Sequence, residues 1–420
     1  MKIFGPADIL LPKNIDLSKW SVVACDQYTS EPGYWEQADK LAAGSPSALN
    51  IIFPEVYLES GDSAERIRKI NETMQRYIDD GIFEEFRNSM IYVERRQSDG
   101  RIRHGIVGAV DLECYDFSAG SQSPIRATEG TILSRIPPRQ RIRENAPLEL
   151  PHIIMLADDR EHRIVESAEK RKDGLRLVYD FDLMLGGGHI TGRLLDEEAV
   201  SEVMAGLSAL EDDDAYREKY GAEDGCKLVL AVGDGNHSLA TAKTCWEELK
   251  KTLPREQLKT HPARYALVEL MNLHDDALEF EAIHRVLFDV DALSVMSEFN
   301  EYYPQASEEN NGGQRVRIVY GDTERTFYIN AAPSVIPAGT VQRFIDDYIE
   351  RNGGTVDYIH GEDVTRSLAA EPGRIGFILD SLGKDELFET VIKDGALPRK
   401  TFSMGEAADK RFYLEARKIR

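Results

Sequence analysis

Apolar and polar positions alternate along the chain in two periods, one helical and one extended. Residues 63–83 and 197–210 place apolar side chains at helical spacing, which predicts two helices. Short apolar or alternating runs predict strands at residues 90–95, 103–112, 153–157, 175–181, 228–232, 265–271 and 315–320. The first two strands are joined through Ser98, Asp99 and Gly100, a sequence typical of a hairpin turn. This mixed order of helices and strands predicts an α/β (mixed α+β) fold.

The junction after residues 228–232 is the most informative part of this pattern, because an apolar strand runs into a polar loop and then a helix. The loop offers two glycines, a carboxylate, an amide, an imidazole and a hydroxyl: Gly233, Gly235, Asp234, Asn236, His237 and Ser238. Glycine permits backbone conformations and close approaches that a side chain forbids. The N–H groups in the first turn of the following helix favour negative charge. The junction therefore predicts an anion-binding site, with an ordinary strand–turn–helix connection as the alternative.

The same loop resembles the Ala-Asp-Gly-His-His-Arg-Tyr signature of the DUF1015 family, whose name marks the lack of an assigned function, with residues 233–239 aligned on it. Further segments resemble other elements of this family: residues 23–32, 52–57, 126–131, 283–286 and 397–402. The first two are similar to one branch of the family. The last three stand where the family carries His-Glu-x-Thr, Thr-His-Arg-Val and a closing Pro-x-Lys-Ser-Thr. The resemblance thus covers most of the chain.

The chain also departs from the family pattern at positions that bear on chemistry. Asn236 stands in place of the first histidine of the signature, and Ser238 stands in place of its arginine. A fixed positive charge is therefore absent beside the expected phosphate site. In the upstream element Thr128 replaces histidine and Gly130 interrupts the usual run.

The loop is similar, in addition, to Asp-Gly-His-Arg-type elements of the ParB and sulfiredoxin-like nucleotide-binding fold, which includes free-serine kinases. This resemblance implies a ParB/sulfiredoxin-like nucleotide-binding element within a larger mixed-sheet architecture. It further implies that the loop and the start of the helix hold nucleotide phosphates. Mg²⁺ would arrive with ATP or ADP, held by the phosphates and by a carboxylate such as Asp234.

The resemblance, together with the arginine cluster described below, gives a set of candidate site residues. Glu129 is expected to act as the base on the acceptor side, with Asp234 and His237 as the other catalytic residues. Residues expected to bind phosphate or substrate are Arg126, Arg139, Gly233, Gly235, Asn236, Ser238, His284, Arg285, Lys400 and Thr401. For His237 and His284 the alternative is a histidine hydrogen-bonded within the fold. For residues 398–401 the alternative is an exposed basic turn.

An arginine cluster follows the upstream element: Arg126, Arg135, Arg139, Arg141 and Arg143. Guanidinium groups suit phosphate and carboxylate oxygens, which favours Arg126 and Arg139 as ligands. Pro137 and Pro138 lie within the cluster and predict a loop rather than a regular helix. Arginines in such a loop also commonly face water or pair with surface acids, and that alternative stays open.

Composition narrows the classes of partner and the domain organisation. The 420 residues are 42% hydrophobic and 30% charged, as in a folded protein of about two domains. A formal net charge of −23 argues against a protein that binds nucleic acid or acidic membranes, because such proteins depend on basic surface. The polar stretch at residues 307–314 predicts a main α/β domain over residues 1–305. Residues 306–420 would then form a C-terminal α+β region that contributes Lys400 and Thr401 to the site.

The spacing of cysteines and histidines argues against a dedicated metal centre. The four cysteines form no Cys-x-x-Cys pair, and the nine histidines form no His-x-x-x-His pair. Widely spaced cysteines are typical of reduced thiols. No apolar run approaches the roughly 20 residues of a membrane span. We therefore expect a cytoplasmic protein without a membrane partner.

These observations lead to three functional hypotheses. The first is a nucleotide-dependent phosphotransferase, a small-molecule kinase that acts on a small hydroxylated, serine-like metabolite. The second is a phosphatase of a small phosphorylated metabolite such as phosphoserine. The third is a non-catalytic sensor of a nucleotide or metabolite, which the replacements at Asn236 and Ser238 favour.

Overall fold

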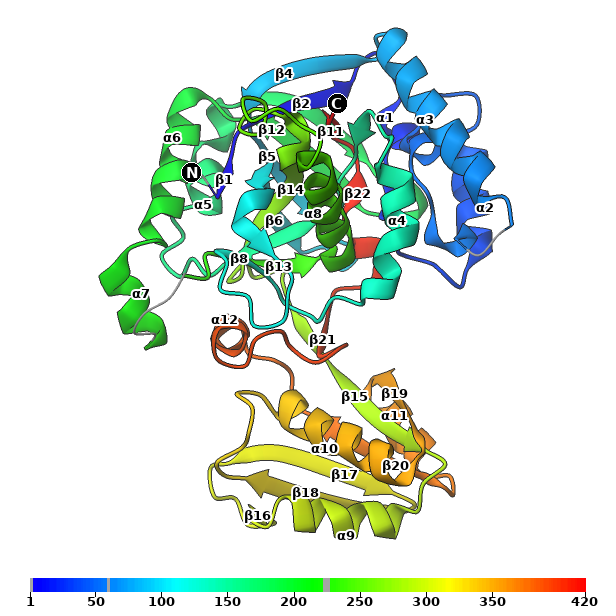
Figure 1. The fold of residues 1–420 in the computed structure, drawn as a ribbon, viewed down its shortest axis with the longest axis vertical. Helices are drawn as coiled ribbons and strands as arrows, with labels where there is room; N and C mark the ends of the chain where they lie inside the picture. The colour runs from blue at the N-terminus through cyan, green and yellow to red at the C-terminus, as the bar shows by residue number, and fades with distance from the viewer. Residues whose placement is uncertain (1–2, 59–60, 222–226) are drawn as a thin grey trace. The chain divides into compact units, whose positions relative to one another are not determined.

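The computed structural model describes residues 3–58, 61–221 and 227–420, which form two compact units (Figure 1). Unit 1 comprises Met1–Ala127, Thr131–Leu278 and Glu406–Arg420. Unit 2 comprises Thr128–Gly130 and Glu279–Gly405. Among the four cysteines, Cys25, Cys114 and Cys245 are free thiols, and Cys226 lies outside the described residues. No helix in the described ranges combines the length and the apolar character needed to cross a bilayer.

Unit 1 is built on a mixed sheet, which confirms the predicted α/β class. Its main path runs β11 (Arg176–Asp182), β12 (His189–Leu194), β5 (Ile91–Arg96), β6 (Ile102–Asp111), β14 (Tyr265–Asn272), β10 (Ile154–Ala157), β13 (Leu230–Asp234), β8 (Ile125–Ala127) and β7 (Tyr115–Asp116), with β1 (Phe4–Gly5) paired to β6. The pairs β10–β14, β13–β8 and β7–β8 are parallel, and the other pairs are antiparallel.

Helices cover both faces of this sheet. Successive residues of a strand point to opposite faces, so each strand contributes to two cores. On one face, Tyr92 and Val268 pack in a core with side chains from helices α5 (Val165–Arg171), α6 (Glu197–Ala209) and α8 (Asn236–Lys250). On the other face, Val93 and Leu267 pack in a core with α1 (Leu17–Trp20), α2 (Pro32–Ala42) and α3 (Ser63–Asp79). The result is a three-layer arrangement, with the sheet in the middle.

The end of the chain returns to unit 1 and closes its second core. Strand β22 (Phe412–Tyr413) pairs with β3 (Val22–Val23), and β23 (Arg417–Lys418) pairs with β9 (Leu148–Glu149). Phe412, Tyr413 and Leu414 are buried in the same core as α1 to α3. Residues that are far apart in the sequence therefore meet beside the sheet.

Several local predictions can be compared with the observed elements. The hairpin through Ser98, Asp99 and Gly100 is confirmed, since it joins β5 to the antiparallel β6. The helix expected over residues 63–83 ends at Asp79. Gly81 then adopts a left-handed conformation with φ +64°, and β4 (Phe83–Ser89) pairs with β2 (Ala7–Pro12).

The prediction of a loop at Pro137 and Pro138 is wrong. The short 3₁₀ turn η4 (Leu133–Arg135) leads into helix α4 (Ile136–Arg143), which contains both prolines. They lie in its first turn, where a backbone N–H has no intrahelical acceptor and its loss is harmless. Arg139, Arg141 and Arg143 thus share one helix.

Unit 2 is an antiparallel sheet with helices. The sheet runs β16 (Ala306–Ser307), β18 (Thr323–Ile329), β17 (Gln314–Tyr320), β20 (Arg374–Leu379), β15 (Phe280–Phe288) and β19 (Thr355–His360), with β21 (Phe402–Met404) on β15. The helices are α9 (Ala292–Tyr302), α10 (Pro337–Asn352), α11 (Glu362–Ala369) and α12 (Lys384–Lys393). Phe299 contacts the rings of Phe344 and Phe377 in its interior. The polar stretch 307–314 joins β16 to β17 within this unit. The main segment of the unit starts at Glu279, because β15 pairs with β19, β20 and β21.

Candidate functional site

The end of β13 and its turn into α8 are shaped by two glycines, Gly233 within the strand and Gly235 after it. Gly235 has φ +80° and precedes the first residue of α8, Asn236. A Cβ on Gly235 would lie 3.1 Å from the Cα atom of Ile153, and a Cβ on Gly233 would lie 2.8 Å from the Leu156 side chain. The loop therefore needs glycine for its conformation at Gly235 and for close packing at both positions.

Helix α8 begins at Asn236, so Asn236, His237 and Ser238, which the sequence analysis assigns to the loop, form its first turn. The N–H of Leu239 donates to the carbonyl of Gly235 at 3.0 Å and opens the helical ladder. The preceding N–H groups, up to Ser238, belong to the first turn, where the helix itself supplies no acceptors. The positive end of the helix thus coincides with Asn236, His237 and Ser238.

Asp234 and His237 both have partners within unit 1. Asp234 Oδ1 accepts a hydrogen bond from the N–H of Gly235 at 2.9 Å, and Oδ2 lies 3.4 Å from Lys410 Nζ. His237 Nε2 accepts from the N–H of Ile132 at 3.3 Å. Burial, together with the positive charges of Arg139 and Arg135, lowers the pKa of His237 to about 4. The imidazole is therefore neutral at physiological pH and acts here as a hydrogen-bond acceptor.

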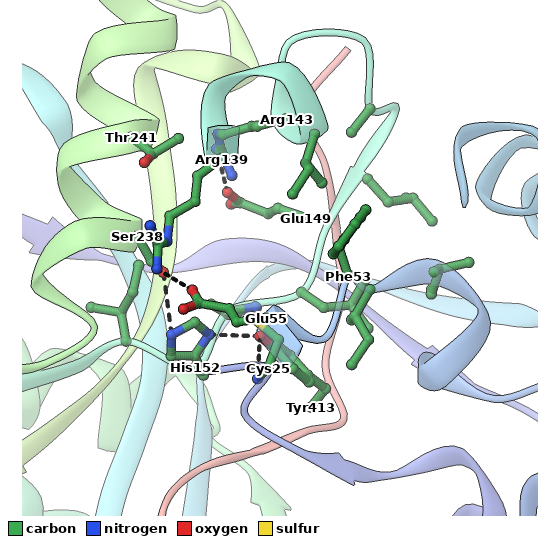
Figure 2. A pocket seen from close by; sticks show the side chains of 18 of the residues that line it. Cys25, Phe53, Glu55, Arg139, Arg143, Glu149, His152, Ser238, Thr241 and Tyr413 are labelled. Carbon is green, nitrogen blue, oxygen red and sulfur yellow. Dashed lines mark hydrogen bonds and ion pairs between the residues drawn. The ribbon is translucent and has the colours of Figure 1, made fainter. Parts of the chain in front are cut away.

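A cavity of about 150 Å³ opens beside the first turns of α8. It is lined by Ser238 and Thr241 of α8 and by Arg139, Ile142 and Arg143 of α4. The other lining residues come from elsewhere in unit 1: Cys25, Ile51, Ile52, Phe53, Glu55, Leu58, Met74, Ala146, Leu148, Glu149, Leu150, Pro151, His152, Ile153 and Tyr413. Figure 2 shows Glu55, Arg139, His152 and Ser238 pointing toward one another in this cavity. The cavity thus combines a helix start, guanidinium groups and carboxylates.

A chain of hydrogen bonds runs through His152. Its Nδ1 lies 2.7 Å from Tyr413 Oη, which also accepts from the N–H of Cys25 at 3.2 Å. Its Nε2 lies 3.2 Å from Ser238 Oγ and 3.6 Å from Asp26 Oδ2. Burial opposes the charge on Asp26, but His152 and a hydrogen bond from Gln27 hold its pKa below the ordinary value. The chain fixes the Ser238 hydroxyl at the helix start.

Two arginine–carboxylate pairs border the cavity. Arg139 pairs with Glu55, and its Nη1 donates to the carbonyl of Arg135 at 2.7 Å. Arg143 Nη2 lies 2.6 Å from Glu149 Oε2. Burial raises the pKa of Glu55 in spite of Arg139, and the negative charge of Asp26 adds to the rise. Glu55 is therefore a carboxylate that gains a proton more readily than an exposed one.

Within unit 1 the structure brings together most of the predicted residues. Arg139 and Ser238 line the cavity, and the other residues of the loop flank it: Gly233, Asp234, Gly235, Asn236 and His237. Arg126 lies on β8, next to β13, and is buried. Its Nε donates to the carbonyl of Ser123 at 2.9 Å, so the guanidinium holds the turn that precedes its own strand.

The remaining predicted residues belong to unit 2: Glu129, His284, Arg285, Lys400 and Thr401. Glu129 pairs through its backbone with Leu397. His284 Nδ1 accepts from the N–H of Leu379 at 3.3 Å, and burial lowers its pKa to about 4. Arg285 is fully buried, and its Nε donates to Gln342 Oε1 at 3.3 Å. Thr401 Oγ1 donates to the carbonyl of Pro398 at 2.7 Å, and Lys400 has a left-handed backbone with φ +50°.

The sequence also predicts that Asp234 helps to bind a Mg²⁺ ion that arrives with the nucleotide. The described part of the chain holds no group of three or more His, Cys, Asp or Glu side chains that could bind a metal ion. Asp234 offers one carboxylate, and Lys410 already lies beside it. Mg²⁺ with ATP or ADP therefore stays a prediction, in which the nucleotide phosphates supply most of the ligands.

Sequence reasoning assigned no role to Cys25, Asp26, Glu55, His152 and Tyr413, although the structure places all of them at or beside the cavity. The first three lie in residues 23–32 and 52–57, whose similarity to a family branch was a usable signal. His152 and Tyr413 are 261 positions apart and belong to no such motif.

Solved structures that are similar to this chain include a free serine kinase in complex with AMP. Its TM-score is 0.39, with 10% identity, and the match covers 74% of this chain and 91% of the kinase. SbnI with a C-terminal truncation from Staphylococcus aureus has a TM-score of 0.36, with 10% identity and coverage of 73% and 82%. A conserved hypothetical protein from Pyrococcus furiosus has a TM-score of 0.35, with 9% identity and coverage of 74% and 94%.

No curated protein matches the chain. One family model, described as a protein of unknown function (DUF1015), matches residues 9–348. The match spans most of the sequence and includes all of the similar segments except residues 397–402: the chain belongs to the DUF1015 family.

Proposed function

We propose that unit 1 binds the phosphates of a nucleotide at the start of α8 and transfers a phosphoryl group to the hydroxyl of a small, serine-like metabolite. One observation carries this proposal. The first turns of α8, the guanidinium of Arg139 and the carboxylate of Glu55 all border the same cavity. Phosphoryl transfer depends mainly on positioning and on stabilising negative charge, and these groups suit both needs.

In this proposal the arginines of α4 provide the positive charge that the loop before α8 lacks. Ser238 stands where the family signature carries arginine, so the loop lacks its own fixed cation. Helix α4 packs against α8, and Arg139 and Arg143 border the cavity together with Ser238. In the proposed reaction these guanidinium groups supply the positive charge, because they can donate two hydrogen bonds at once to phosphate oxygens.

The transfer step requires a proton acceptor, and Glu55 is the proposed one. The acceptor hydroxyl oxygen forms a bond to the terminal phosphorus while the bond from that phosphorus to the bridging oxygen breaks. The shortened nucleotide leaves with the bond electrons, and the hydroxyl proton passes to the Glu55 carboxylate. A carboxylate whose pKa is raised by burial is a better acceptor than an exposed one.

Magnesium would enter with the nucleotide and neutralise phosphate charge. Asp234 is the proposed protein ligand, and Lys410 would have to release it. Comparing Glu55→Gln with Glu129→Gln decides which carboxylate serves as the base.

The direct test follows phosphorus NMR signals while the protein is incubated with ATP or ADP, Mg²⁺ and a panel of hydroxy-amino acids. A new phosphomonoester signal with serine supports transfer. Release of inorganic phosphate alone indicates the phosphatase alternative, and a nucleotide-dependent rise in Tm without turnover indicates the sensor. If neither nucleotide nor phosphate changes the Tm, the phosphate-site idea is contradicted in all three forms.

Arg139→Met tests the arginine assignment. We expect kcat/KM to fall by about 100-fold or more, as when a charge-stabilising donor is lost. Arg141→Met is the matched control, because Arg141 lies on the same helix, is exposed and does not line the cavity. Equal activity of the two variants would remove Arg139 from the mechanism.

A further inference from the structure

The cavity beside α8 has a polar side and an apolar side. Glu55, Arg139, His152 and Ser238 belong to the polar side, and Figure 2 shows Phe53 on the opposite side of Glu55 from Ser238. Apolar side chains make up the greater part of the wall, among them Ile52, Phe53, Leu58, Met74, Ile142 and Leu150. A ligand made only of phosphate and hydroxyl groups would leave this apolar wall in contact with water. The wall therefore indicates a further property of the ligand.

The apolar side continues the core of unit 1 that α1, α2 and α3 cover. Phe53 and Met74 are buried members of that core, and Leu58, Ile142 and Leu150 pack against it. The last three are only half-buried and line the cavity, so they keep apolar surface that a ligand can cover. Removing such surface from water is favourable in proportion to its area. An apolar group of the ligand thus gains affinity on this side.

The charged groups of the wall are paired with one another. Arg139 pairs with Glu55, and Arg143 Nη2 lies 2.6 Å from Glu149 Oε2. Arg417 Nη2 adds a second partner for Glu149, 2.7 Å from its Oε1. The two arginines and the two glutamates that line the cavity therefore balance in formal charge. An uncharged group suits the apolar side, because a charged one would lose its hydration without gaining a counter-charge.

The volume of the cavity sets the size of this group. The cavity encloses about 150 Å³, and an apolar cavity of about this volume can hold benzene. Pockets that enclose whole drug-sized ligands commonly measure about 300–1,000 Å³. The cavity therefore has room for a small acceptor, whereas a nucleotide can bring its phosphates to the first turn of α8 only with its base outside.

We infer that the acceptor is a hydroxy-amino acid that carries a branched alkyl group on its hydroxyl-bearing carbon, and not serine itself. Because the acceptor is defined by the proposed transfer, this inference rests on the proposed function. The alkyl group packs on Phe53, Leu58 and Leu150, and the hydroxyl faces Glu55. The bonds made and broken are those of the proposed transfer, in which the hydroxyl oxygen attacks the terminal phosphorus and Glu55 takes the proton.

Two matched acceptors isolate the effect of the alkyl group. β-Hydroxyleucine carries an isopropyl group on the hydroxyl-bearing carbon, and β-hydroxyasparagine carries there a polar carboxamide of nearly the same shape. Isothermal titration of the full chain, with and without AMP, should show that β-hydroxyleucine binds at least about tenfold more tightly. With ATP or ADP and Mg²⁺, kcat/KM from phosphorus NMR should favour it by a similar factor. It should also exceed threonine, whose methyl group covers less of the apolar wall.

The outcomes separate this inference from the proposed function. Equal or tighter binding of β-hydroxyasparagine, or binding of neither compound, would overturn the inference. Transfer to both compounds with equal kcat/KM would also overturn it and would leave the proposed function intact. Preferred binding of β-hydroxyleucine without transfer to any acceptor would contradict the proposed function, while the apolar preference of the cavity would stand.

Variants of the wall locate the alkyl group. Leu150→Asn and Ile142→Thr make the apolar side more polar, and each should lower the preference for β-hydroxyleucine over β-hydroxyasparagine by about threefold or more. Ile78→Thr is the matched control for Ile142→Thr. Ile78 is also helical, half-buried and packed against the same core, but it does not line the cavity.

An unchanged preference in both cavity variants, or an equal loss in Ile78→Thr, would place the alkyl group elsewhere and overturn the inference. Circular dichroism checks that each variant is folded. Ile142→Thr decides the matter if Leu150→Asn does not fold.

Discussion

Unit 1 contains two sets of arginine–carboxylate pairs that differ in what surrounds them. Arg139 and Glu55 border a cavity, with side chains 14% and 16% exposed. Arg411 pairs with Glu269 and Glu415, and these side chains are 2%, 1% and 0% exposed. Tyr179 Oη closes the second set by donating to Glu415 Oε1 at 2.6 Å. We call Arg411, Glu269, Glu415 and Tyr179 the buried ion cluster.

An arginine–carboxylate pair can therefore belong either to a binding site or to the structural core, and the residue types alone do not distinguish the two. In the buried ion cluster the partners of Arg411 are protein carboxylates, and the cluster ties β11 and β14 to the end of the chain. Beside α8 the same kind of pair faces a cavity, so a ligand can compete for Arg139. A buried charge without a partner is far more costly than one that solvent can reach. Substitution in the buried ion cluster should therefore mainly lower the stability of the fold, whereas substitution of Glu55 or Arg139 should mainly lower activity.

Arg411→Met should give the largest effect on stability. It leaves Glu415 buried without its cation and leaves Glu269 with Arg103 alone, 3.8 Å away, and we expect a loss of about 3–5 kcal/mol in the free energy of unfolding. Urea denaturation at neutral pH measures it. Adding Glu269→Gln and Glu415→Gln should recover part of the loss, because the unpaired charges are then removed. A change below about 1 kcal/mol in the single variant would place this cluster with ordinary surface pairs.

Glu55→Gln should instead affect activity more than stability. We expect phosphoryl transfer to fall by about 100-fold or more, since a general base is lost. The free energy of unfolding should change little or rise slightly at neutral pH. Burial raises the pKa of Glu55, so its charged form is the less favoured one in the folded state. Phosphorus NMR and urea denaturation of the same sample provide both readings, and a large loss of stability with normal turnover would reverse the assignment.

Asp158, a buried carboxylate of unit 1, extends the comparison to the stability of the fold at acid pH. Burial opposes the charge on Asp158, but hydrogen bonds from His274, Lys219 and Tyr220 lower its pKa to about 2. Because the folded pKa lies below the unfolded value, the carboxylate stabilises the fold above about pH 4 and loses this effect as the pH falls toward about 2. Asp158→Asn should cost about 2 kcal/mol at neutral pH, and the difference should vanish near pH 2. Urea denaturation across this range checks it, and a constant difference would exclude the charge as the cause.

His237 should give the smallest effect. Its folded pKa of about 4 lies below that of a free histidine, so the neutral ring stabilises the fold above about pH 6.5 and this contribution declines between pH 6.5 and about 4. His237→Gln keeps an acceptor for Ile132 and should remove about 1 kcal/mol of the pH dependence in that window, discounted for partial exposure. Thermal unfolding from pH 4 to 8 measures it. An unaltered slope would mean that other groups govern this range.

The local parts of the fold follow well from the sequence. The strand predicted at residues 228–232, observed as Leu230–Asp234, the hairpin through Asp99 and the turn at Gly235 depend on neighbouring residues, so a short window of sequence contains the information. The errors are also local. Helix α3 ends before Gly81, and Pro137 and Pro138 occupy the first turn of α4, where proline is favourable. The prediction of a loop took proline as unfavourable anywhere in a helix, although proline is favourable in the first turn.

Short segments of sequence predict the alternation of helices and strands and the glycine-containing turn before α8, and motifs spread along the chain indicate the family. Which charged side chains meet follows from how the chain packs in three dimensions. Arg139 reaches Glu55 across 84 positions, and His152 reaches Tyr413 across 261. The packing of α4 on α8 and the return of the chain end to β3 create these contacts. Such pairs arise from the topology of the sheet and its layers, which no local pattern encodes.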